Sequence, residues 1–172
     1  MIFLSVWINA VLSGLMALNV TLPMTDTNPS ETANLCLTEW YVGQGEYKCY
    51  MDYRSITDTS SPQWELQQEA WTDDNGLRRY EDRYCIALGS AYGSEIGARY
   101  IIELEDGAQY RCVLADQKAD CDTNAEHTAD MNGAVVEFIV DTPVLPNDVR
   151  SMGDVSYING FAGEIRKIYQ ED

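Results

Sequence analysis

Acidic side chains gather within residues 112–141 of this chain. An apolar run leads to Asp116, and Asp120 and Asp122 follow within seven residues. A second run, rich in β-branched and aromatic residues, carries Glu137 in its interior. Carboxylates at the ends of β-type segments can bind a cation or act as general acids and bases. An acid inside an apolar run needs an explanation, so this region is the first candidate site.

The spacing of the acids suggests a metal site. Asp120, Asp122 and Asn124 are spaced like the start of a calcium loop, but Ala125 replaces the glycine at position six and Met131 replaces the glutamate at position twelve. This excludes an EF-hand and leaves a looser calcium site at Asp120 and Asp122 as an alternative. The chain has one histidine, so structural zinc is not expected. No other cofactor is predicted.

The five cysteines favour an extracytoplasmic chain that contains disulfides. Cys36 with Cys49 and Cys112 with Cys121 are the local pairs that would each close a short loop. The sequence alone cannot fix this connectivity, and the odd count leaves one thiol over.

The pattern of the chain predicts a mainly β protein with few helices. Ser61 and Pro62 open a short helix that runs to Ala70. The segment 72–76 is a turn, 78–83 a charged edge, and Asp106 and Gly107 form a hairpin turn. The aromatic residues in 37–53 are compatible with a short hairpin or a surface patch, although core packing is their expected use. Strands are expected at 84–88, 99–104, 109–114, 135–140, 153–157 and 163–169.

The N-terminal residues predict export. Residues 1–20 contain no charged side chain, which favours a secretory signal peptide; a membrane anchor and a buried core helix are the alternatives. Residues 21–35 form a polar linker. We expect an aromatic extension with the short helix over 36–83 and a barrel-like domain over 84–172. The protein is therefore predicted to be secreted or on the cell surface, contacting a membrane only through its first segment.

The composition restricts the partners. The chain has 28 acidic and 11 basic residues in 172, a net charge of −17 and a pI near 4.1. Such a surface repels phosphate backbones, which argues against nucleic-acid binding. Cationic partners and neutral glycans remain open.

The order of motifs in the second half of the chain resembles a known family. Residues 95–101 (EIGARYI) are similar to its "x-I-P-x-G-T-x-V-x-I" segment, residues 115–118 (ADQK) to its "A-D-T-G" motif, and Gly133 with residues 136–139 (VEFI) to its glycine and "I-D-L-F" strand. The chain thus resembles the 3D (three-aspartate) cell-wall proteins, relatives of membrane-bound lytic transglycosylase A. Two departures stand out: a longer connection, KADCDTNAEHTADMN, and Glu137 where the family has Asp.

This resemblance implies a small six-stranded double-psi β-barrel and a peptidoglycan lytic transglycosylase or glycosidase activity. Glu137 would be the catalytic acid, because an apolar strand desolvates it and a nearby Asp116 disfavours a second negative charge, both raising its pKa. Asp116 would orient substrate or stabilise positive charge. The candidate substrate-binding residues are Lys118, Tyr92, Asp120 and Asp141.

Other interpretations stay open. Glu137 can face solvent in an alternating strand, and Asp141 can be a turn residue. The chain can also be a non-catalytic extracellular module that binds a glycan or a protein, or a structural phage or surface protein on the same scaffold. For a glycan-binding module the candidate sugar-stacking aromatics are Trp40, Tyr41, Trp64, Trp71 and Tyr92.

Overall fold

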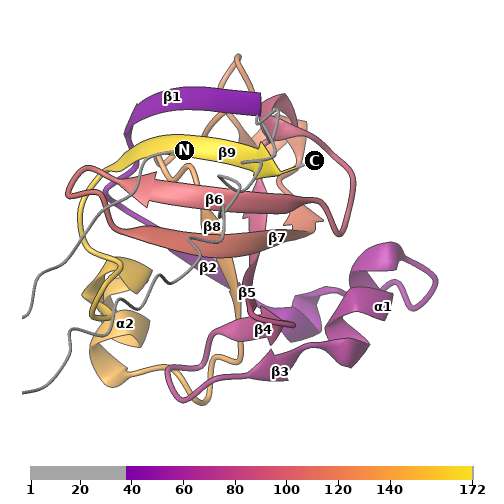
Figure 1. Cartoon of the computed structure of the whole chain (residues 1–172). Helices are drawn as coiled ribbons and strands as arrows, with labels where there is room; N and C mark the ends of the chain where they lie inside the picture. Colours follow the sequence, from indigo (N-terminus) through magenta and orange to yellow (C-terminus); the bar gives the residue numbers. More distant parts are fainter. Residues whose placement is uncertain (1–37, 172) are drawn as a thin grey trace, which may run out of the picture. The chain divides into compact units, whose positions relative to one another are not determined.

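A computed structural model describes residues 38–171 of the chain. The predicted signal or anchor segment, the linker and Cys36 lie outside the described residues. The described part is mainly β, as predicted: nine strands form one mixed sheet that does not close, with two short α-helices beside it (Figure 1).

The elements follow one another along the chain with short connections. The helices are α1 (Pro62–Glu69) and α2 (Asn147–Met152), and four single-turn 3-10 helices are η1 (Tyr53–Ser55), η2 (Ser90–Tyr92), η3 (Asp120–Asp122) and η4 (Val155–Tyr157). The strands are β1 (Thr38–Gln44), β2 (Cys49–Asp52), β3 (Trp71–Thr72), β4 (Arg78–Tyr80), β5 (Arg83–Leu88), β6 (Arg99–Leu104), β7 (Gln109–Gln117), β8 (Glu137–Val140) and β9 (Ile165–Glu171).

Strand β5 is the centre of the sheet. The main order is β1-β9-β6-β7-β5-β4-β3, and β8 joins β5 to β2 outside that path. The β5/β7 and β2/β8 pairs are parallel, while β5/β8, β6/β7 and β6/β9 are antiparallel. Residues 38–83 therefore share one sheet with residues 84–171.

Several predicted elements are confirmed. Helix α1 begins after Ser61, whose Oγ accepts a hydrogen bond from the backbone N–H of Trp64 at 3.1 Å, and Pro62 occupies its first position. Strand β6 has the predicted bounds, and the turn at Gly107 (φ 85°) connects it to β7. Strand β7 extends three residues beyond its predicted end, as far as Gln117.

Two regions differ from interpretations of the sequence. Residues 38–53 do not form the short hairpin that was one alternative for the aromatic segment, because β1 pairs with β9 and β2 with β8. Residues 153–157 are not a strand: Gly153 ends α2 in the left-handed conformation (φ 68°), and the Asp154 side chain then caps η4. Here local capping outweighs the β-type pattern.

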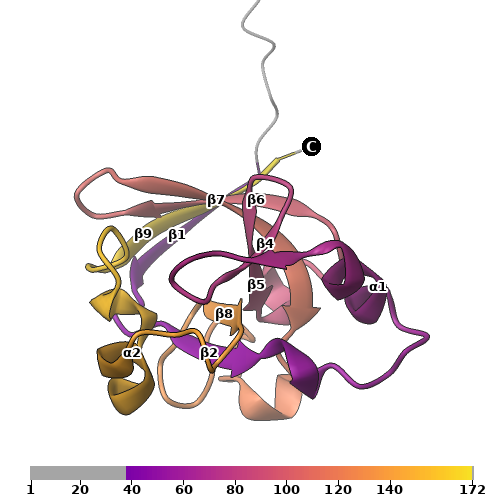
Figure 2. The ribbon, with the colours of Figure 1, turned by 90° about the horizontal axis from the view of Figure 1, so that it is seen from below.

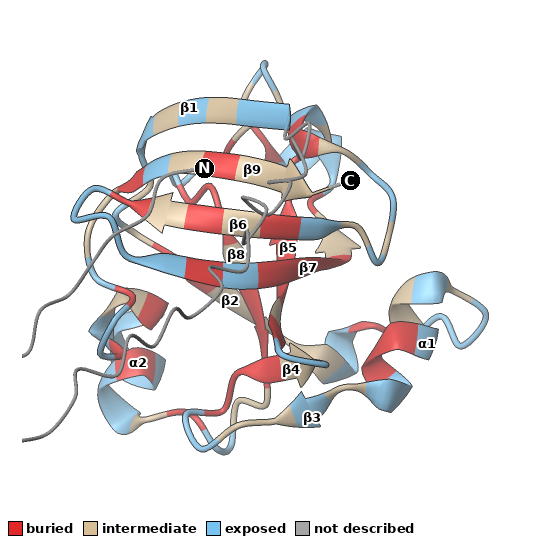
Figure 3. Cartoon of the chain, in the orientation of Figure 1, coloured by how far each residue is buried: buried red, intermediate tan, exposed pale blue. Residues whose placement is uncertain are grey.

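The core lies on both faces of the central strands (Figure 3). The larger cluster contains the mutually packed rings of Tyr84, Tyr110, Phe138 and Phe161, with centroids 5.1–6.2 Å apart. Burying each large apolar side chain contributes about 1.5–3 kcal/mol. Trp40 packs against this cluster, which is the expected core use of an aromatic residue from the first strand.

A smaller cluster lies on the opposite face. It comprises Leu66 from α1 together with the buried side chains Cys85, Ala87, Val113, Ala115 and Ile139. The segment predicted as a charged edge lies beside it, but Arg78 and Arg83 are buried there, with exposed fractions of 7% and 2%. Arg78 donates hydrogen bonds to the backbone oxygens of Gln67 and Ala70, which fixes α1 to the sheet.

Candidate functional site

A bulge in β7 decides the direction of Asp116. Ile86 pairs with Leu114, whereas the next residue, Ala87, pairs with Asp116, so Ala115 is the extra residue. In a regular strand Asp116 would share the face of Leu114 in the larger core cluster. The bulge turns Asp116 onto the opposite face, beside Ala87.

Glu137 reaches the same face from the other side of β5. It pairs with Ala87 in the antiparallel β5/β8 pair and with Cys49 in the parallel β2/β8 pair. Residues directly opposite each other on neighbouring strands point to the same face. Cys49, Glu137, Ala87 and Asp116 therefore form one row across β2, β8, β5 and β7. Figure 2 shows these four strands from below.

Both carboxyl groups are half-buried, and burial raises both pKa values. For Asp116, the pKa increase is opposed by hydrogen bonds from the backbone N–H of Gln117 at 2.9 Å and from Gln63 Nε2 at 3.4 Å. For Glu137, burial is the main cause of the increase; the charge of Lys118 lowers its pKa, while Asp130 and Asp116 raise it. Both acids thus bind their proton more tightly than an exposed carboxyl group does.

Lys118 forms a buried network beside Glu137. Its Nζ donates to Asp130 Oδ2 and to the backbone oxygen of Ala134, both at 2.8 Å, and Cys49 Sγ lies 3.4 Å from Asp130 Oδ2. The Lys118 side chain is 3% exposed. This network holds the ends of the loop between the two carboxylates. It also keeps the ammonium group of Lys118, a predicted substrate-binding residue, inside the protein.

Asp120 and Asp122, the predicted calcium ligands, lie in η3 and are exposed. Asp120 Oδ1 accepts a hydrogen bond from Ser90 Oγ at 2.7 Å and lies 3.6 Å from Nδ1 of His127. Within residues 38–171 no group of three or more His, Cys, Asp or Glu side chains is arranged to hold a metal ion. The calcium alternative therefore gains no support from the described residues.

Two predicted substrate-binding residues lie elsewhere. Tyr92 is buried, with its ring 5.4 Å from that of Trp40 in an edge-on arrangement, so it offers no face to a sugar. Asp141 follows the opposite end of β8 from Glu137, and its Oδ1 is 2.5 Å from the guanidinium of Arg54. Neither residue joins the Asp116 and Glu137 row.

The predicted disulfide between Cys112 and Cys121 is wrong. Cys112 is a free thiol buried in the core on β7, whereas Cys121 is a free thiol exposed on η3. Cys49 and Cys85 are also buried free thiols. The proposed partner of Cys49, Cys36, lies outside the described residues.

Sequence reasoning missed the residues that surround the carboxylates. Gln63, Cys49 and Asp130 come from distant segments, and nothing in their local spacing indicated the contacts. Two cavities of about 360 and 190 Å³ were also missed; Glu46, Tyr47 and residues 154–163 line the first, and Tyr53, Arg54 and α1 line the second. Neither Asp116 nor Glu137 lines either cavity.

Comparison with protein-family models, with curated proteins and with solved structures gave no match. No helix within the described residues is long and apolar enough to cross a membrane.

Proposed function

We propose that this chain is a secreted or cell-surface protein that cleaves a cell-wall glycan by carboxylic-acid catalysis. Glu137 is the general acid, and Asp116 orients the substrate or stabilises developing positive charge. The observation that carries this proposal is the shared partner of the two acids: both pair with Ala87 and lie on the same face of the sheet. Burial supplies the raised pKa that a general acid requires near neutral pH.

The proposal includes a double-psi β-barrel as the scaffold. One support is the resemblance of residues 95–101, 115–118 and 133–139 to the 3D cell-wall proteins. The other is the presence of two parallel strand pairs, β5/β7 and β2/β8, which are joined because β8 also pairs with β5. The loop between Asp116 and Glu137 connects β7 to β8, the strands that pair with β5 on either side.

The chemistry follows from the roles of the two acids. Glu137 donates its proton to the glycosidic oxygen while the bond from that oxygen to the anomeric carbon breaks. The resulting carboxylate then accepts a proton from the sugar's own hydroxyl as that oxygen attacks the anomeric carbon and closes an anhydro ring. The Asp116 carboxylate faces the positive charge that develops on the sugar. Peptidoglycan is the expected substrate.

Hydrolysis by water is the close variant. Two strand spacings of ~4.8 Å each separate the backbones of Asp116 and Glu137, since β5 lies between them. Retaining glycosidases hold their carboxyl groups at about 5–5.5 Å, and inverting enzymes at about 6.5–9.5 Å to admit a water. The distance between the two carboxyl groups themselves decides between the two stereochemical outcomes.

Zymography on peptidoglycan, with analysis of the released sugars by mass spectrometry, tests the proposal. Wild type should clear the substrate, while Glu137→Gln and Asp116→Asn should each lower the rate by roughly 100-fold or more. Asp122→Asn is the matched control, because Asp122 is an exposed acid in the same loop region. Anhydro sugars would identify a transglycosylase, and reducing ends a hydrolase.

A non-catalytic binding module is the second candidate. Two aromatic side chains from the predicted sugar-stacking set are exposed, Tyr41 at 74% and Trp71 at 51%, and neither cavity is lined by the two acids. If purified wild type binds peptidoglycan without clearing it, this module replaces the enzyme as the function.

A further inference from the structure

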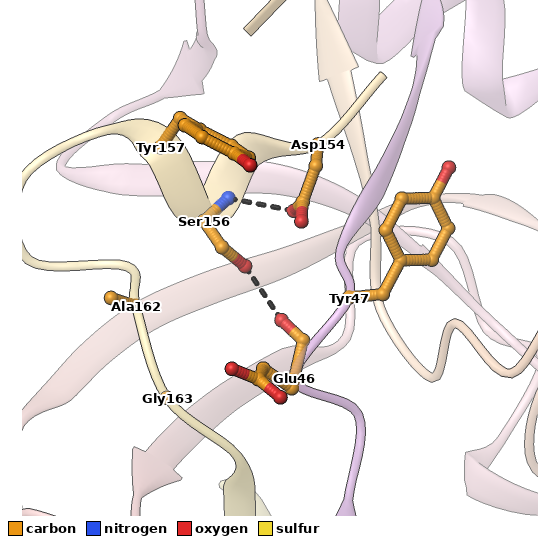
Figure 4. Close-up of a pocket in the computed structure, with 7 residues that line it drawn as sticks. All are labelled: Glu46, Tyr47, Asp154, Ser156, Tyr157, Ala162 and Gly163. Carbon is orange, nitrogen blue, oxygen red and sulfur yellow. Dashed lines mark hydrogen bonds between the residues drawn. The ribbon is translucent and has the colours of Figure 1, made fainter. Parts of the chain in front are cut away.

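The larger cavity lies apart from the two carboxylates and is lined by three segments (Figure 4). Glu46 and Tyr47 come from the connection between β1 and β2, Asp154 and η4 form a second wall, and Ala162 with Gly163 precede β9. The rings of Tyr47 and Tyr157 lie on opposite sides of the Ser156 backbone and the Asp154 side chain. Its volume of about 360 Å³ falls within the range of small-molecule sites.

A fully buried lysine ties these segments together. Lys48 Nζ donates to the backbone oxygens of Glu46 at 3.0 Å and Gly163 at 2.7 Å, and to Ser156 Oγ at 3.5 Å. Each acceptor belongs to a different segment of the cavity wall. Asp154 Oδ1 connects two of these segments as well, because it accepts hydrogen bonds from the backbone N–H groups of Lys48 and Ser156. The cavity is therefore held in shape before any ligand arrives, which lowers the entropic cost of binding.

The contacts argue against a serine nucleophile here. The Ser156 hydroxyl donates its proton to the backbone oxygen of Glu46 at 2.6 Å, not to Lys48. The three protons of the Lys48 ammonium each have an oxygen acceptor, so Lys48 holds the walls and does not act as a base. These contacts favour a binding site over a catalytic site.

The lining matches the chemistry of a neutral sugar. The exposed ring of Tyr157 offers an apolar face on which a pyranose can stack, and the carboxylates of Glu46 and Asp154 accept hydrogen bonds from hydroxyl groups. The same carboxylates disfavour a phosphate or carboxylate ligand. We propose that this cavity is a second saccharide-binding site, separate from Asp116 and Glu137, which takes a neutral sugar unit of the glycan. The class of sugar rests on the proposed function.

Calorimetric titration with the tetrasaccharide of N-acetylglucosamine tests this site. The titrated protein carries Glu137→Gln, so that the ligand is not cleaved during the measurement. We expect Tyr157→Ala in this background to weaken binding roughly tenfold, the loss expected when about 1.4 kcal/mol of stacking is removed. Val144→Ala, which shortens an exposed apolar side chain outside the cavity lining, should leave the affinity unchanged.

Amide chemical shifts provide the second readout. The tetrasaccharide should shift the resonances of Tyr47, Ser156 and Gly163. The spectrum of Tyr157→Ala away from the cavity should match that of the parent protein, which shows that the variant is folded. Equal affinities for Tyr157→Ala and Val144→Ala, or no binding at all, would overturn the site. If the wild type binds the tetrasaccharide at this cavity but does not clear peptidoglycan, the second site stands and the catalytic proposal fails. The failure of one proposal can therefore be told apart from the failure of the other.

Discussion

Asp116 and Glu137 pair with one residue, Ala87, from opposite sides of the central strand β5. Burial raises the pKa values of both acids. Placing two carboxyl groups on a largely covered sheet face costs stability at neutral pH, a cost that is common at functional sites. This cost can be measured separately from any catalytic activity.

The pH dependence of stability should reveal the cost of Glu137. Its pKa in the folded protein lies above the ordinary value of 4.5, so the folded state holds the proton more tightly than the unfolded state. The associated stability is complete below about pH 4 and is lost as the pH rises through the folded pKa. Glu137→Gln is neutral throughout, so its unfolding free energy relative to wild type should increase from pH 4 to pH 7. Urea unfolding across this range measures the difference.

Glu126→Gln, at an exposed position of the connecting loop, provides the control for a general charge effect. If the two variants change stability in parallel with pH, the burial of Glu137 is not the cause. Asp116→Asn should follow the trend of Glu137→Gln, because burial also raises the pKa of Asp116.

Gly89 should tolerate no side chain. A Cβ at this position would lie 2.0 Å from the backbone oxygen of His127, although the backbone of Gly89 itself is ordinary extended chain. We expect Gly89→Ala to displace the loop that carries His127 and to cost about 1–3 kcal/mol in unfolding free energy. Gly133→Ala, at φ 93° with open space around the new Cβ, should strain the backbone without moving that loop. Amide chemical shifts of residues 120–130 distinguish the two results.

The ion pair of Arg83 with Glu171 should be worth more than those at the surface. Arg83 is 2% exposed, and its NH1 lies 2.5 Å from Glu171 Oε2. Glu171→Gln leaves the guanidinium without its counter-ion and should cost about 3 kcal/mol. Glu81→Gln removes the exposed partner of Arg99 and should cost less than about 1 kcal/mol. Similar losses in thermal unfolding for the two variants would contradict the burial argument.

Thiol reactivity should separate Cys121 from the other described cysteines. Cys49, Cys85 and Cys112 are buried, and burial raises the pKa of each, that of Cys85 to about 12. In a Cys36→Ser background, a disulfide reagent should modify one thiol rapidly in the native protein and the other three after unfolding. Cys121→Ser should remove the rapid phase. A persistent rapid phase would mean that a buried cysteine becomes accessible.

Elements with strong local signals could be predicted from the sequence. Ser61 and Pro62 define the start of α1, and the hydrophobic pattern gives β6 its bounds. The segment 153–157 could not be predicted in the same way. Its apolar residues fit a strand, but Gly153 ends α2. The Asp154 carboxylate, which caps η4, also accepts the backbone N–H of Lys48, about a hundred residues earlier.

The sequence by itself determined that this protein is strongly acidic and mainly β, that Asp116 follows one apolar run and that Glu137 lies within the next. Only the tertiary structure decided on which face the two acids lie. Side chains alternate along a strand, so a single extra residue, Ala115 in the bulge of β7, reverses the direction of Asp116. The partners of these strands are likewise set by long-range pairing, because β5 joins β7 and β8 through hydrogen bonds that no local spacing encodes.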